Sequence, residues 1–142
     1  MGESLIRAAE ARDSAALAGL IEQLGYTATA AEVARRLDVM RAEARAVMVA
    51  ELDGEVVACL STSIMRVLHR PAPVGRISMM VVREGLRGRG IGSALVREAE
   101  RVLADQGCYM VEVTSHMRRT QAHRFYEKLG YARTSVRLAR EL

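Results

Sequence analysis

Residues 87–92 read Arg-Gly-Arg-Gly-Ile-Gly, and this stretch decides the fold because of what lies on each side of it. An apolar run at residues 77–82 precedes it, and residues 93–103 follow with apolar side chains at helical spacing. This order predicts a strand, a glycine-rich turn and a helix. Such a turn presents free backbone N–H groups to an anion, and the helix dipole favours negative charge there. Arg87 and Arg89 add positive charge, so the stretch predicts a binding site for a phosphorylated cofactor.

The length and composition are those of one globular domain. The chain has 142 residues, of which 50% are hydrophobic and 27% charged, and we expect a single domain over residues 1–142. No apolar run approaches the ~20 residues that span a membrane, and the N-terminus lacks the pattern of a signal peptide. Cys59 and Cys108 lie in apolar segments, which favours buried thiols over a disulfide or a metal site. We therefore expect a cytoplasmic protein with no membrane partner and no metal.

The charge pattern argues against nucleic acid as a partner. The formal net charge is only +4, aromatic residues make up 4% and there is no Trp. A nucleic-acid-binding surface would combine a broad basic face with aromatic platforms. Basic residues instead gather at residues 83–89 and 118–124, and two such clusters suit one polyanionic small molecule better.

The remaining patterns predict a mixed α/β domain. A helical pattern over residues 17–24 ends at Gly25, and a capping box at residues 29–32 begins a second helix. Two apolar segments joined by Asp53 and Gly54 predict a β-hairpin. After the glycine-turn helix come a strand at residues 109–113, a helix at about residues 120–129, and an alternating tail at residues 131–142 that suits one last strand. The strand–helix–strand unit should be parallel and right-handed.

A second motif makes the chain recognisable. Residues 118–131 predict an amphipathic helix ended by a glycine, and residues 122–131 have the form A-x-x-F-Y-E-x-L-G-Y. Together with the glycine turn, which matches the pattern Q/R-x-x-G-x-G/A, this segment resembles the GNAT superfamily of acyl-coenzyme A N-acyltransferases. The resemblance covers nearly the whole chain. It implies a mixed, strongly twisted sheet of six to seven strands with about four helices, whose central strands splay apart to admit coenzyme A.

The resemblance also implies where acetyl-coenzyme A binds as co-substrate. The strand before the turn would serve the pantetheine arm and the acetyl carbonyl, and the turn would hold the pyrophosphate. Arg119 stands where the family often has Asn, close to the cofactor. The cofactor-binding residues implied in this way are Met80, Val81, Val82, Arg87, Gly88, Arg89, Gly90, Ile91, Gly92, Ser93 and Arg119.

Two residues are candidates for the chemistry of acetyl transfer to a primary amine. Tyr126 resembles the family's general acid, which protonates the departing sulfur. A free amine is mostly ammonium at neutral pH, so its proton must also be accepted. The strand before the turn offers only Ser78 among apolar residues, whereas Glu112, on the next strand, resembles the Glu used by some protein N-terminal acetyltransferases. Alternatively, Glu112 is an ordinary solvent-facing strand residue. The proton of the amine would then pass to water or to one of three weaker candidates: Glu84, His116 or His123.

Other functions remain open at the level of sequence. The chain would catalyse direct transfer in a ternary complex, or it would be a degenerate family member that binds coenzyme A as a sensor or scaffold. A dinucleotide oxidoreductase is a third possibility, because Glu112 follows Gly92 by the spacing of a ribose-binding acid. The acceptor, whether a small-molecule or a peptide amine, is not specified by any motif. A homodimer is plausible by family habit.

Overall fold

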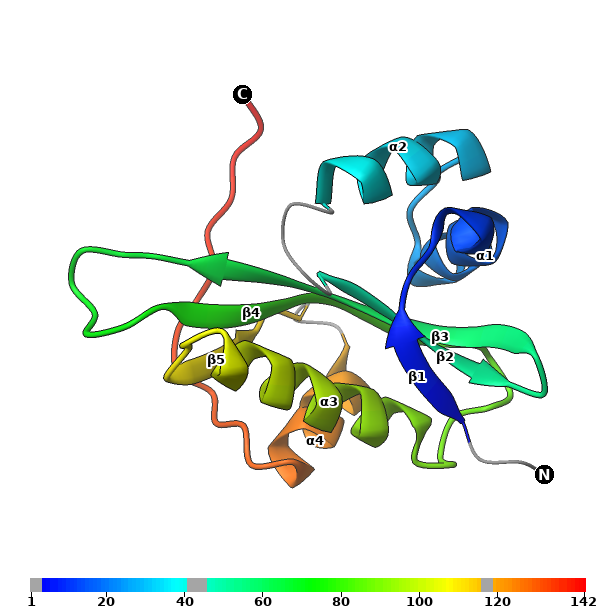
Figure 1. Cartoon of the computed structure of the whole chain (residues 1–142). Helices are drawn as coiled ribbons and strands as arrows, with labels where there is room; N and C mark the ends of the chain where they lie inside the picture. Colours follow the sequence, from blue (N-terminus) through cyan, green and yellow to red (C-terminus); the bar gives the residue numbers. More distant parts are fainter. Residues whose placement is uncertain (1–3, 41–45, 116–118) are drawn as a thin grey trace.

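The computed structural model describes residues 4–40, 46–115 and 119–142, and its centre is one mixed β-sheet (Figure 1). The described strands follow one another across the sheet in the order of the sequence, and β5 alone is parallel to its neighbour, β4. Their bounds are β1 Leu5–Ala8, β2 Val47–Leu52, β3 Glu55–Met65, β4 Val74–Val82 and β5 Met110–Val113.

Helices cover both faces of the sheet. The short η1 (Ala11–Asp13) leads into α1 (Ser14–Leu24), which packs with α2 (Ala30–Met40) on one face. The other face is covered by α3 (Ile91–Asp105) and α4 (Thr120–Lys128), as Figure 1 shows. Leu17 and Leu20 of α1 bury themselves against Val49 and Cys59, whereas Leu95 of α3 belongs to the core on the opposite face. The sheet is thus the middle of three layers, each contact stabilised by buried apolar surface.

Several local predictions are confirmed. Gly25 ends α1 with φ +109, and the Thr29–Glu32 capping box forms with both hydrogen bonds at 3.1 Å. The β2–β3 hairpin turns through Asp53 and Gly54, which both have positive φ, as a tight hairpin turn requires. Cys59 is fully buried and Cys108 partly buried, and both are free thiols.

The expected number of strands is wrong. The described residues form five strands rather than six to seven, and the tail after α4 contains no strand. The alternation of the tail does suit a strand, but a strand forms only where its backbone finds a partner edge. Val136 and Leu138 are instead 84% and 91% exposed. The tail therefore does not complete the sheet of its own chain.

β4 and β5 diverge along their length, and this divergence opens the sheet between them. The two strands pair only from Val74 opposite Met110 to Ile77 opposite Val113. Beyond Ile77, β4 keeps β3 as its partner on one edge, and no described residue pairs with its other edge. Ser78 is the extra residue of a β-bulge, because Ile77 and Met79 face the consecutive residues Thr62 and Ser61. A bulge bends a strand and increases its twist, which suits the opening between β4 and β5.

No helix in the described part of the chain is long and apolar enough to cross a membrane.

Candidate active site

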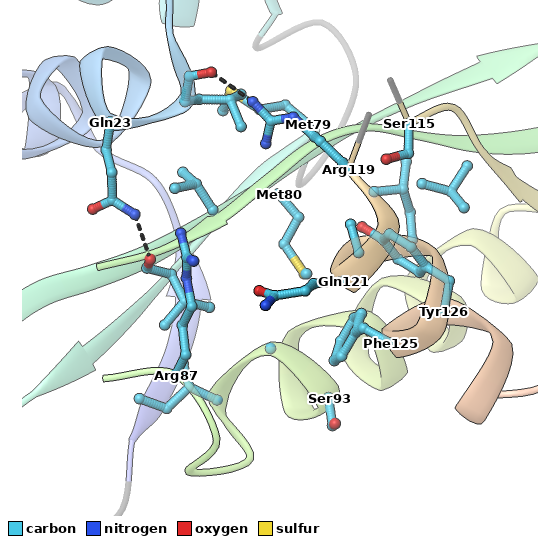
Figure 2. Close-up of a pocket in the computed structure, with 18 of the residues that line it drawn as sticks. Gln23, Met79, Met80, Arg87, Ser93, Ser115, Arg119, Gln121, Phe125 and Tyr126 are labelled. Atoms are coloured by element: carbon cyan, nitrogen blue, oxygen red, sulfur yellow. Dashed lines mark hydrogen bonds between the residues drawn. The ribbon is translucent and has the colours of Figure 1, made fainter. Parts of the chain in front are cut away.

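A cavity of about 930 Å³ lies where β4 and β5 diverge (Figure 2). Its volume is in the range of small-molecule and cofactor sites. The walls come from the end of α1, from β4 beyond its paired part, from the glycine turn with the start of α3, from the segment after β5, and from the first half of α4. Segments far apart in the sequence therefore meet around one hollow, as the resemblance implied.

The glycine turn forms one end of this cavity. Gly88 and Gly90 have φ of +80 and +83, a left-handed conformation that residues with a Cβ rarely adopt. Gly90 is the N-cap of α3 and makes no side-chain capping bond, so the first N–H groups of the helix have no intrahelical partner. Gly92 lines the cavity, and a Cβ there would lie 3.3 Å from Phe125 Cζ. Exposed amides at a helix start are suited to an anion.

The cavity gathers almost all of the predicted cofactor residues. Arg89 is the exception, because it does not line the cavity. Those that do are Met80, Val81, Val82, Arg87, Gly88, Gly90, Ile91, Gly92, Ser93 and Arg119.

Sequence reasoning missed Gln23, which fixes the end of β4. Its side-chain amide donates to the carbonyl of Val82 at 2.8 Å and its Oε1 accepts from the N–H of Glu84 at 2.9 Å. Gln23 thereby ties α1 to the strand that lines the cavity, and the first of these bonds is the dashed line at Gln23 in Figure 2. Nothing in the sequence around Gln23 signals these contacts, because the partners lie some sixty positions along the chain.

Tyr126 reaches from α4 into the cavity and is only 7% exposed (Figure 2). Edge-to-face contacts hold its ring, with centroids 5.0 Å from Phe125 and 5.7 Å from Tyr131. Burial raises the pKa of Tyr126 to about 12, against a smaller lowering by the Arg119 guanidinium. Its side chain lines the cavity. Tyr126 is therefore a protonated, rigidly held donor at neutral pH.

Glu112 is not brought to the same cavity. Its Oε1 accepts hydrogen bonds from Nε and Nη2 of Arg76 at 2.9 and 2.6 Å, across the paired part of β4 and β5. It does not line the cavity that contains Tyr126. The structure shows Glu112 in an ion pair with Arg76. Its role as general base stays a prediction.

The other polar residues considered from the sequence differ in their relation to the cavity. Ser78 lines the cavity, and its hydroxyl lies 2.7 Å from that of Ser61. Glu84 and His123 do not line it, and His116 lies outside the described residues. The described part of the chain also contains no group of three or more His, Cys, Asp or Glu that could hold a metal ion.

Comparison with known proteins decides the family. A model of the acetyltransferase (GNAT) family matches residues 8–131. The chain belongs to this family. Its members use acetyl-coenzyme A as acetyl donor, which sets aside the dinucleotide alternative. The GNAT chain has features that suit such a molecule. Gly88 and Gly90 leave open space where a side chain would lie, Arg87 lines the same cavity, and the edge of β4 has no partner among the described residues.

Individual relatives are similar over different parts of the chain. Aminoalkylphosphonate N-acetyltransferase of Salmonella typhimurium is 34% identical over 90 residues, which cover 63% of this chain and 58% of that protein. The alignment thus spans less than two thirds of the relative. The crystal structure of glucosamine-6-phosphate N-acetyltransferase from Arabidopsis thaliana has a TM-score of 0.86 and 26% identity, over 99% of each chain. An aminoglycoside N-acetyltransferase solved in complex with CoA shares the fold, with a TM-score of 0.85, 19% identity, and coverage of 98% of this chain and 95% of that one.

The glycine turn of this GNAT chain gives a direct test of the site. An L-residue at φ near +80 is strained by about 1–3 kcal/mol, so Gly90→Ala should shift the turn. Since about 1.4 kcal/mol corresponds to a tenfold change in affinity, we expect the affinity for coenzyme A, measured by calorimetry, to fall about tenfold.

Gly107→Ala is the matched control. Gly107 has φ +92 and equally open surroundings, but it lies beyond the other end of α3, outside the cavity. Both variants should lose similar stability to urea, and only Gly90→Ala should lose affinity. Equal affinities in the two variants would place the pyrophosphate away from the turn.

Proposed function

We propose that the chain is an acetyl-coenzyme A-dependent N-acetyltransferase that transfers the acetyl group directly to a primary amine while both substrates are bound. The observation that carries this proposal is the position of Tyr126 in one cavity with the glycine turn and the unpaired edge of β4. A binding module would need the turn and the edge alone. A tyrosine whose side chain lines the same cavity adds a proton donor, which binding alone does not require.

The unpaired edge of β4 supplies the binding surface for the pantetheine arm. Met80, Val81 and Val82 line the cavity, and their strand has no described partner on that side. Extended ligands add to such an edge through main-chain hydrogen bonds. A backbone N–H on this edge would polarise the thioester carbonyl and stabilise negative charge on its oxygen. Gln23 holds the end of the strand in place through Val82.

Tyr126 supplies the proton for the leaving group. During transfer the carbon–sulfur bond breaks and a carbon–nitrogen bond forms, while the amine loses one proton and the sulfur gains one. With a pKa of about 12, the Tyr126 hydroxyl stays protonated until negative charge develops on the sulfur beside it. The tyrosine then regains its proton from solvent or from the proton released by the amine.

The relatives support an amine as the acceptor. The Salmonella relative is named for aminoalkylphosphonate and the Arabidopsis structure for glucosamine 6-phosphate. Both are amines that an N-acetyltransferase modifies. Since the aligned part spans little more than half of the Salmonella protein, we carry over the reaction class and not that substrate.

Tyr126→Phe tests the role of the hydroxyl. General acid catalysis contributes about 10²–10⁴-fold, so we expect kcat for thiol release from acetyl-coenzyme A, with an amine acceptor, to fall at least about 100-fold. The affinity for coenzyme A should change little, because the ring and its aromatic contacts remain.

Tyr131→Phe is the matched control, because the Tyr131 hydroxyl donates to Glu100 at 2.8 Å outside the cavity. It should keep kcat and lose some stability. Coenzyme A binding without thiol release on any amine would instead support the sensor or scaffold. An unchanged kcat in Tyr126→Phe would remove the tyrosine from the mechanism.

A further inference from the structure

The charged side chains among the described residues that line the cavity are all positive. Among the described lining residues, the ionisable side chains are Arg87, Arg119, Tyr26 and Tyr126, and there is no Asp or Glu. Arg87 belongs to the turn, where the phosphates of coenzyme A match its charge. Arg119 lies elsewhere, beside the end of α1 (Figure 2). None of the described lining residues carries a carboxylate that could match its charge.

Arg119 is held in position without being neutralised. It is the N-cap residue of α4, and its Nη2 donates to the Leu24 carbonyl at the end of α1, at 2.6 Å. A guanidinium has five N–H donors in a fixed fork, so most of them remain available. No carboxylate of the described residues forms an ion pair with it. The side chain therefore bridges α1 and α4 across the cavity while its positive charge stays unmatched.

We propose that the acceptor carries an anionic group, such as a phosphonate, phosphate or carboxylate, close to its amine, and that Arg119 binds this group. The inference rests on the proposed function and specifies its substrate class. A planar guanidinium binds such oxyanions through paired hydrogen bonds. A polyamine would instead bring further ammonium groups to a cavity wall that already carries this cation.

Matched acceptors test the proposal. We expect 2-aminoethylphosphonate to be acetylated with a kcat/KM at least about tenfold above propylamine, and 1,3-diaminopropane to be the poorest of the three. Arg119→Gln should raise KM for the phosphonate about tenfold or more and leave propylamine nearly unchanged. Arg119→Lys should recover part of the loss. Arg124→Gln removes the same charge from an exposed position of α4 outside the cavity and should match the wild type.

Three outcomes would overturn the proposal. A preference for 1,3-diaminopropane would contradict the acceptor class while leaving the proposed N-acetyltransferase intact. Equal losses for all amines in Arg119→Gln, together with weaker coenzyme A binding, would assign Arg119 to the coenzyme. Absence of thiol release from any amine by the wild type would refute the proposed function, and the acceptor class with it.

Discussion

The site depends on a single break in strand pairing. β4 and β5 share only four paired positions, ending at Ile77 and Val113, and the bulge at Ser78 turns the rest of β4 away. A buried strand edge without a partner would be costly, because each free N–H and C=O loses its hydrogen bonds to water. Here the edge borders a cavity, where a ligand or water has room to bond to it. The loss of pairing between β4 and β5 beyond Ile77 thus leaves a binding surface in the middle of the sheet.

Both core layers are needed to hold this opening. α3 packs on β3 and β4 through residues such as Leu95 and sets the glycine turn at one end of the cavity. On the opposite face, α1 contributes Gln23, which bonds the end of β4, and Leu24, which accepts from Arg119. Substrates would thus meet between two layers whose positions are fixed by buried apolar contacts. Rigid support of this kind holds the Tyr126 ring in one position at the cavity wall.

The features that depend on local sequence pattern could be predicted. The glycine turn was predictable because only glycine adopts the φ of Gly88 and Gly90 easily, and Tyr126 because its motif follows at the family's spacing. The contacts of Gln23 and Arg119 were not predictable, because they join residues far apart in the sequence through atoms that no pattern specifies. Glu112 was chosen by its place on a strand, and its pairing with Arg76 depends on the register of β4 and β5. The last strand was expected from alternation alone, which indicates what a segment can form and not where its partner lies.

Amide hydrogen exchange, with and without coenzyme A, tests the central claim most directly. If the coenzyme lies along the free edge of β4 and on the start of α3, the amides of residues 79–82 and 91–93 should exchange at least about tenfold more slowly when it is bound. Residues 5–8 in β1, at the far edge of the sheet, should not change. Protection confined to other segments, or unchanged exchange along β4 at saturating coenzyme A, would contradict the account.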